Sequence, residues 1–324
     1  MKIMKFMNRI PGGLVIVPMV AVSVIFATFF PGFMKLGGFT SALFSSDSTS
    51  FVIAVLLFIS GVQFDLHDFV PAMKRGGALT LGRLLIGILC EWLVLHFFGP
   101  DGFLGISALS IVIAMTSCNP GVYLSVCQES GDKLDIPGFG VMNLLPVPAV
   151  PILMLGAASG APFDGMSLLV TIIPFLLGIF FGNIDKGCRD VFGGATPVFL
   201  IFLGVTCGAT LDWKDMFFQV PQGILLSVLY FAITIPLQLV VDRFVLKRPG
   251  YGAVSMSSIS GVSIIMPAAV AAVLPAYQQY TASAVAQLGL AVILTDLFSP
   301  VLIKLALQKW GGAEEREESY EQIV

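Results

Sequence analysis

Charged residues are scarce in this sequence. Asp, Glu, Lys and Arg make up 11% of its 324 residues, whereas they supply roughly a quarter of a typical soluble domain. Hydrophobic residues make up 56%, and the mean hydropathy is +0.94. This composition excludes a soluble globular protein. The apolar runs are long and continuous rather than short and alternating, which excludes a membrane β-barrel. The sequence predicts an all-α polytopic membrane protein.

Histidine and cysteine are also few. The two histidines, His67 and His96, lack metal-ligand spacing, and the five cysteines are scattered along the chain. No Walker motif is present, so ATP is not expected to drive the protein. We expect no metal, no cofactor and no nucleic-acid partner. No pair of nucleophile and base is visible at one membrane depth, so we do not expect an enzyme.

Ten apolar segments have about the 20 residues that a bilayer crossing requires. They cover 12–31, 43–64, 76–98, 103–127, 138–159, 166–183, 195–211, 220–242, 251–275 and 282–307. Of the 17 Lys and Arg residues, all except Lys35, Lys214 and Arg83 fall in the termini and alternate loops on one side of these segments. Basic loops lie on the cytoplasmic side, so both termini are predicted to be cytoplasmic.

The fourth segment is interrupted by polar residues. Thr116 to Gly121 reads T-S-C-N-P-G in the middle of an apolar run. Proline and glycine interrupt a helix, and the freed backbone groups must be buried in protein or line a wet cavity. One interpretation is a structural kink. The other is a discontinuous helix whose broken ends form a binding site.

An internal repeat supplies a second copy of this interruption. Residues 61–68 resemble residues 208–215, at an offset of 147. The same offset places Thr116 on Ser263 and Pro120 on Pro267, within the serine-rich ninth segment. Two five-helix halves are of opposite orientation, because five is odd. We therefore predict inverted repeats at 1–159 and 160–308, followed by an acidic cytoplasmic tail at 309–324. Broken helices in corresponding positions of such repeats indicate a secondary transporter.

Polar residues at both interruptions are the candidate substrate site. Hydroxyl, amide and free backbone groups can bind the oxygen atoms of a small anion. The alternative for any single hydroxyl is a hydrogen bond to its own helix. Arg83 either binds a substrate carboxylate or extends toward the membrane surface. The candidate substrate-binding residues are Thr116, Ser117, Asn119, Gly121, Ser258, Ser260, Ser263, Arg83 and Asn143.

Two acidic residues inside predicted spans are candidates for ion coupling. Asp296 lies near the centre of the tenth segment and Glu91 within the third. Acidic residues at membrane depth are costly and usually functional. Removal from water favours the neutral form of a carboxyl group, which suits a group that takes up and releases protons. The alternatives are a neutral Asp296 bonded to a neighbouring helix and a Glu91 near the outer interface.

Several motifs together resemble the 2-keto-3-deoxygluconate permeases. They are I-P-G-G at 10–13, M-T-x-x-N-x-G-x-Y at 115–123, P-F-L-x-G-x-x-x-G-N-x-D at 174–185 and the serine-rich ninth segment. The resemblance implies a proton symporter of a bacterial cytoplasmic membrane that imports a sugar-acid anion. The family is also similar in fold to the bile-acid/sodium symporters. That similarity implies crossing broken helices 4 and 9, a core of helices 3–5 and 8–10 and a panel of helices 1, 2, 6 and 7.

The sequence departs from the family pattern at its membrane carboxylate. Leu145 stands where the family pattern leads us to expect a glutamate, and Asp296 stands where an uncharged residue is expected. The offset of 147 pairs Leu145 with Val292, one turn before Asp296. We hypothesise that the carboxylate has moved from one repeat to the other. The predicted function is import of 2-keto-3-deoxygluconate or a related sugar acid with protons. The alternatives are a sodium-coupled organic-anion symporter, a receptor and a channel.

Overall fold

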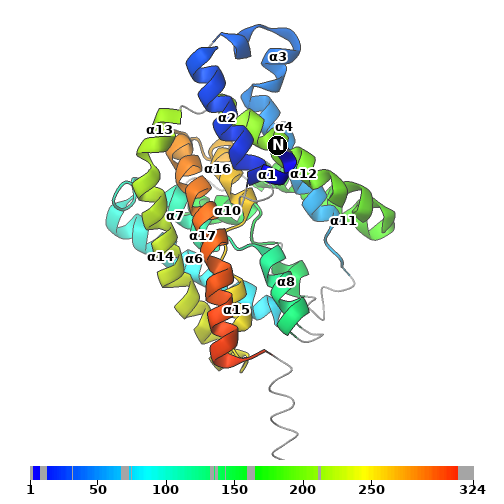
Figure 1. Ribbon diagram of the computed structural model, residues 1–324, viewed down its shortest axis with the longest axis vertical. Coiled ribbons are helices and arrows are strands. Elements are labelled where there is room, and N and C mark those ends of the chain that lie inside the picture. The colour runs from blue at the N-terminus through cyan, green and yellow to red at the C-terminus, as the bar shows by residue number, and fades with distance from the viewer. Residues whose placement is uncertain are drawn as a thin grey trace, which may run out of the picture.

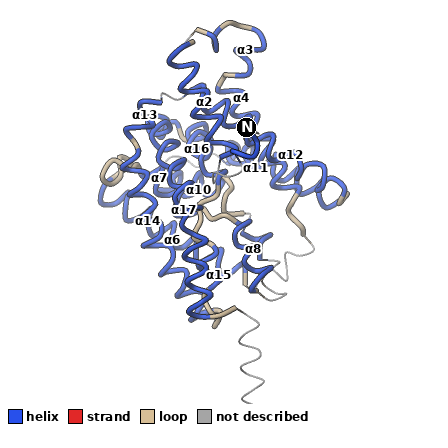
Figure 2. The backbone as a smooth tube through the Cα atoms, viewed as in Figure 1, coloured by secondary structure: helices blue, strands red, loops and turns tan. Residues whose placement is uncertain are grey.

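The computed structural model describes residues 3–7, 13–30, 32–66, 73, 75–131, 135, 138–142, 144–158, 165–210 and 213–312. These residues form helices joined by turns (Figure 2), with a single isolated bridge between Phe103 and Ile106. Five of the helical segments are long and apolar enough to cross a membrane: Gly76–Phe98, Ala108–Ser130, Gly187–Thr206, Val220–Val245 and Pro275–Trp310. Five further apolar helices are shorter. Their lengths and composition suit a chain that crosses a membrane several times.

Four helices form one group, in the upper and right-hand part of Figure 1. They are α2 (Gly13–Phe29), α4 (Ser46–Val62), α11 (Gly165–Ile184) and α12 (Gly187–Thr210). Helix α2 packs along α12, and α4 packs along both α11 and α12. We call α2, α4, α11 and α12 the paired helices.

Glycine allows the paired helices to approach closely. Gly178 and Gly182 of α11 lie against the backbone carbonyl groups of Phe58 and Val62 in α4, and a Cβ atom at either glycine would overlap those oxygens. Gly204 and Gly208 of α12 lie in the same way against the backbone of α2. Small residues at such spacing bring helix backbones together in membranes, where lipid supplies no hydrophobic drive for association.

The remaining long helices form a second group, in the left and lower part of Figure 1. Helix α14 (Val220–Val240) packs against α6 (Gly76–Phe98) and α17 (Thr281–Trp310), and α6 packs against α7 (Ala108–Thr116). Helix α6 buries one face and exposes apolar side chains such as Leu85 and Trp92 on the other. A helix that is apolar on both faces suits an environment of protein on one side and lipid on the other.

The fifth predicted segment, 138–159, is not one continuous helix. It forms α9 (Gly138–Met142) and α10 (Ala149–Ala158), separated by turns. Pro146 and Pro148 lie in the interruption and cannot donate backbone hydrogen bonds, which explains the break. Short elements outside the interruptions include α1 (Ile3–Met7), η1 (Phe33–Lys35), α3 (Gly38–Leu43), α13 (Trp213–Phe218), η2 (Val241–Val245) and η4 (Pro275–Tyr280).

Candidate functional site

The first interruption is a full break between two capped helices. Helix α7 ends at Thr116, and α8 (Pro120–Ser130) begins after an extended segment at Ser117–Asn119. Pro120 occupies the first turn of α8, where its missing N–H costs nothing. The Asn119 side chain accepts a hydrogen bond from the Gly121 N–H at 3.1 Å and so caps α8. The polar stretch is therefore a pair of helix ends and not a kink in one helix.

The second interruption is longer. Helix α15 (Tyr251–Ser255) is followed by non-helical residues 256–260, a 3₁₀ turn at Gly261–Ile265 (η3) and α16 (Met266–Val273). Pro267 lies in the first turn of α16, as Pro120 does in α8. Both breaks are thus followed by a helix with proline in its first turn.

The two breaks bind each other directly. The Asn119 N–H donates to the Ser258 carbonyl oxygen at 2.8 Å. The Ser117 and Ser263 hydroxyl oxygens are 2.5 Å apart, and the Ser260 N–H donates to the Ser117 hydroxyl at 3.2 Å. Backbone groups that the helices leave unpaired are satisfied in this way within the protein. We call residues 117–119 and 256–263 the crossing.

Helix α17 lies along one side of the crossing. Its Asp296 carboxylate accepts hydrogen bonds from the Ser258 hydroxyl and from the Asn119 side chain. Thr295 accepts the Ile259 N–H at 3.1 Å. Asp296 therefore contacts both breaks, since Asn119 belongs to the first and Ser258 to the second.

Helices α6 and α14 contact the crossing through a second set of groups. The Tyr230 hydroxyl of α14 lies 3.1 Å from the Ser117 carbonyl oxygen and 3.0 Å from the Met256 carbonyl oxygen. Arg83 of α6 donates from Nη2 to the same Met256 oxygen at 2.5 Å. Its guanidinium carbon lies 5.2 Å from the centre of the Tyr230 ring. Such a cation–π contact stabilises a charge that is removed from water.

The two sides differ in exposure. Asn119, Gly121 and Asp296 are partly or fully exposed, as is Gly261 at the start of η3. Arg83 is 0% exposed, and Ser117, Ser258 and Ser263 are also fully buried. The exposed surface at and beside the crossing is therefore contributed by Asn119, Gly121, Gly261 and Asp296. We call these four residues the exposed edge.

Of the predicted substrate-binding residues that the structure describes, Asn119 and Gly121 belong to the exposed edge. The buried ones are Thr116, Ser117, Ser258, Ser260, Ser263 and Arg83. Thr116 is buried and donates its hydroxyl to the Val112 carbonyl of its own helix at 2.8 Å, as the alternative for a single hydroxyl anticipated. Arg83 lies behind the crossing and does not extend to the membrane surface. Ser260 is 7% exposed and lies at the start of η3. Asn143 lies outside the described residues.

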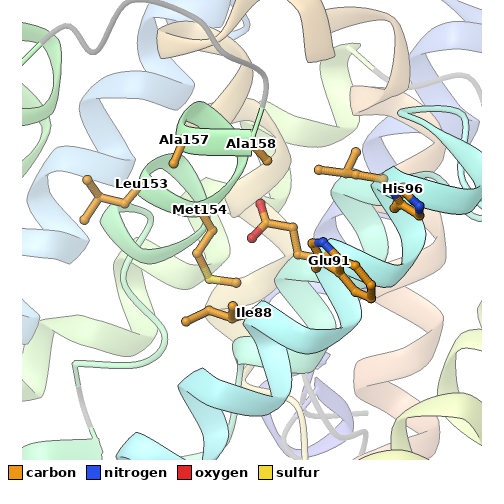
Figure 3. A pocket seen from close by; sticks show the side chains of 9 residues that line it. Ile88, Glu91, His96, Leu153, Met154, Ala157 and Ala158 are labelled. Atoms are coloured by element: carbon orange, nitrogen blue, oxygen red, sulfur yellow. The ribbon is translucent and has the colours of Figure 1, made fainter.

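Glu91 lies in a separate pocket. It is on α6, two turns beyond Arg83, and its Oε1 atom has no hydrogen-bond partner among the described residues. The pocket has a volume of about 680 Å³ between α6 and α10, and Figure 3 shows the Glu91 carboxyl group pointing toward Met154 and Ala158 of α10. The pocket is lined by Ile88, Glu91, Trp92, Leu95, His96, Leu153, Met154, Ala157 and Ala158. Glu91 is thus a buried acid in apolar surroundings, away from the crossing.

Comparison with known proteins identifies the family of this chain. Residues 4–311 match the family described as 2-keto-3-deoxygluconate permease. The chain belongs to the 2-keto-3-deoxygluconate permease family. The family resemblance inferred from the motifs is therefore confirmed. Permeases are transporters and not enzymes, and the apolar helices make this chain a multi-pass membrane protein.

Individual relatives are similar over nearly their whole length. A 2-keto-3-deoxygluconate permease of Enterobacter sp. is 32% identical over 319 residues, which cover 96% of this chain and 95% of the relative. 2-keto-3-deoxygluconate permease 1 of Salmonella typhimurium is 31% identical over 309 residues, 95% and 96% of the two chains. The Bacillus subtilis permease is 30% identical over 307 residues, 93% and 92% of the two chains.

Tyr230 was not predicted from the sequence. A tyrosine within an apolar helix carries no distinctive signal, because its ring is equally suited to a core. The internal repeat could have pointed to Tyr230, because the offset of 147 that pairs Pro120 with Pro267 also pairs Arg83 with Tyr230. The two residues at equivalent positions in the repeat are in contact.

Proposed function

We propose that this permease is a secondary active transporter that imports 2-keto-3-deoxygluconate, or a related sugar-acid anion, together with protons by alternating access. The relatives carry the name of this substrate. Asp296 carries the proposal of proton coupling, because a single titratable group contacts both breaks. Discontinuous helices of this kind form substrate and ion sites in secondary transporters.

Protonation of Asp296 changes what the crossing can bind. An ionised carboxylate accepts hydrogen bonds from both Ser258 and Asn119, whereas a protonated carboxyl group must itself donate one. The protonated group is a weaker acceptor, so in this proposal one of these two polar groups turns to a hydroxyl or keto oxygen of the substrate. Proton uptake and substrate binding are coupled at one place for this reason.

The substrate lies against the exposed edge in this proposal. Asn119 and Gly121 at the start of α8 provide an amide and a helix N-terminus, which favour a carboxylate. Ser258, Ser260 and Ser263 support this surface from the second break. Thr116 and Arg83, which lie behind the crossing, are not among the direct contacts. Glu91 is proposed as a second protonatable group, in its own pocket.

The helix packing supports two inverted repeats. With the offset of 147, α2 corresponds to α11 and α4 corresponds to α12. The repeat therefore maps the observed helix pair α2–α12 onto the observed pair α11–α4, as two-fold symmetry between the repeats requires. The paired helices then form the panel, and helices 3–5 and 8–10 form the core that moves against it. The protein is placed in a bacterial cytoplasmic membrane with both termini cytoplasmic, in accord with its basic loops.

Sodium is the alternative coupling ion. Asn119, Ser258 and Asp296 each carry a side-chain oxygen atom near one point, and hard cations prefer oxygen ligands. Among the described residues no group of three His, Cys, Asp or Glu lies close enough to share a metal ion, so the other ligands of a sodium ion at Asp296 would be neutral oxygens.

Uptake of labelled 2-keto-3-deoxygluconate into proteoliposomes tests the proposal. An inward proton gradient is expected to drive accumulation, and a sodium gradient at constant pH is not. Accumulation with sodium alone would assign the alternative ion. Counterflow of labelled substrate into vesicles loaded with unlabelled substrate separates a carrier from a receptor or a channel, because only a carrier exchanges substrate against a gradient.

A further inference from the structure

Arg83 is a buried cation that forms no ion pair with the acidic residues that the structure describes. It is 0% exposed, and its Nε and Nη1 atoms have no hydrogen-bond partner in the described part of the chain. The ion pairs formed by the described residues join Arg75 to Asp135, Arg248 to Asp135 and Arg189 to Asp65, so none includes Arg83. An arginine stays charged in proteins, and an uncompensated charge is costly to bury. The position therefore requires a negative charge in the vicinity.

Asp296 and Arg83 bind neighbouring residues of the second break. Arg83 binds the Met256 carbonyl oxygen, and Asp296 binds the Ser258 hydroxyl two residues later. Two extended residues span at most about 7 Å. Tyr230 contacts Arg83 and the Met256 carbonyl. The cation and the acid thus act on the same short segment within one low-dielectric region.

Other titratable groups around Asp296 are few. Tyr230 on α14 and Cys118 in the first break face this region. Helix α7, η3 and α16 contribute no titratable side chain, and Tyr251 of α15 is bonded to Asp135. Lys214 of α13 is exposed. Glu91 is further along α6 and faces Tyr277 of η4. Asp242 of η2 (Val241–Val245) is a further buried acid, but its carboxylate accepts the Ala253 N–H at 2.8 Å and has Arg248 and Arg243 as nearby cations. Asp296 has no such cation of its own among the described residues and is the acid that we assign to Arg83.

We propose that Arg83 is a fixed countercharge that links protonation of Asp296 to binding of the substrate carboxylate. This inference rests on the proposed proton symport. In the empty carrier, ionised Asp296 balances Arg83. When Asp296 takes up a proton, Arg83 is left unbalanced, and the carboxylate of the substrate restores neutrality. One proton therefore enters with each anion, and Arg83 acts as a positioning residue through the crossing, without touching substrate.

Charge balance has a consequence for energetics. The Arg83–Asp296 system is neutral both when empty and when loaded with one proton and one anion. A membrane potential acts only on net charge that moves across the bilayer. Transport is then electroneutral, driven by the pH gradient and insensitive to voltage.

Proteoliposomes with wild-type protein provide the first test. Uptake of labelled 2-keto-3-deoxygluconate is measured with a fixed pH gradient, with and without an inside-negative potassium diffusion potential. We expect the potential to change the initial rate by less than about 1.5-fold, since no net charge moves. Uptake that the potential changes several-fold overturns the inference and leaves the proposed symport intact. Absence of uptake under any gradient overturns the proposed function and, with it, this inference.

Equilibrium binding provides the second test, because it separates charge from structure. With one proton bound per anion, wild-type affinity for 2-keto-3-deoxygluconate is expected to fall by up to about tenfold per pH unit once the pH exceeds the pKa of Asp296. Arg83→Lys keeps the charge and should keep this slope. Arg83→Gln should bind at least about tenfold more weakly and lose the slope. Lys304→Gln, which removes one exposed positive charge from α17, is the matched control.

A folded Arg83→Gln protein with the wild-type slope would overturn the inference. If Arg83→Gln does not fold, two other measurements decide. Substrate affinity of Arg83→Lys that does not change with pH contradicts a fixed countercharge. Voltage-dependent uptake by the wild-type protein contradicts it as well.

Discussion

The paired helices and the crossing use small residues for opposite purposes. In the paired helices, glycines such as Gly178 and Gly182 bring two intact helices into contact. Backbone hydrogen bonds remain inside each helix. At and beside the crossing, Gly121 lies in the first turn of α8 and Gly261 begins η3. Backbone groups there bond to serine side chains and to the opposite break. The first arrangement favours rigidity, and the second leaves polar groups that a ligand can compete for.

Polar side chains follow the same division. In the paired helices they gather at one end, where Asn183, Arg189 and Asp65 are partly exposed and bonded to each other or to backbone carbonyls. At the crossing they lie in the protein interior, where Ser117, Ser258 and Ser263 are fully buried. Substitutions at the crossing should therefore change transport more than stability, and substitutions in the paired helices should do the reverse.

The largest effect is expected for Asp296→Asn. Proton-driven uptake should fall by at least about tenfold, because hydrogen bonds to a charged group contribute about 1.5–3 kcal/mol and the titratable proton is lost. Counterflow, which needs no driving ion, should persist. The control is Asp101→Asn, an exposed aspartate that bonds the Tyr280 hydroxyl at 2.6 Å. Undiminished proton-driven uptake by Asp296→Asn would rule out this residue as the coupling group.

Gly182→Val should produce the next largest effect, on stability. The new side chain would overlap the Val62 backbone and destabilise the protein by about 1–3 kcal/mol, as overpacking does. Thermal unfolding in detergent measures the change, and the KM of the folded fraction should stay constant. Gly194→Ala in α12 is the matched control, since no atom lies within 4 Å of the added Cβ. An unchanged Tm in Gly182→Val would contradict the close helix contact.

Ser117→Ala should weaken substrate binding about fivefold. Its hydroxyl joins both breaks, and one buried hydrogen bond contributes about 1 kcal/mol. A double-mutant cycle with Ser263→Ala should give a coupling energy of about 0.5 kcal/mol or more. Ser227→Ala is the control, because within the described part of the chain the Ser227 hydroxyl bonds the Gly223 carbonyl of its own helix and no other group. Additive effects of the two serine substitutions would show that their hydroxyls act separately.

The smallest effect is expected for Asp65→Asn. This change removes the ion pair with Arg189 at the partly exposed end of the paired helices. Such pairs contribute about 0–1 kcal/mol and weaken with salt. The Tm should fall slightly at low salt and converge with the wild-type Tm at high salt, without a change in KM. A clear loss of transport would show that the paired helices contribute to transport as well as to stability.

Elements that depend on local chemistry could be predicted from the sequence. The third predicted segment, 76–98, coincides with α6, because a long apolar run suffices to define a membrane helix. The break before Pro120 was also predicted, since proline removes a donor wherever it lies. The interruption between α9 and α10 was missed, although Pro146 and Pro148 signalled it, because the surrounding residues are continuously apolar.

Contacts between helices could be predicted only in part. The repeat predicted that 117–121 has a counterpart near Pro267, and the family resemblance implied that the two broken helices cross. Neither source indicated that Asp296 contacts both breaks or that Tyr230 joins the carbonyl groups of Ser117 and Met256. The sequence also left open whether Arg83 reaches the membrane surface. A helical pattern indicates how far along its helix a residue lies, but not which groups of other helices surround its side chain.

The sequence by itself determined the membrane class, the two breaks and the offset of 147, because hydropathy, proline chemistry and repetition are properties of the chain. The tertiary structure decided which polar groups meet. Arg83 became a buried cation behind the crossing, and Asp296 became the carboxylate at its exposed edge. The physical reason is that the energetic effect of a charge depends on the distance to its partners and on the surrounding dielectric, and both are set by how the helices pack.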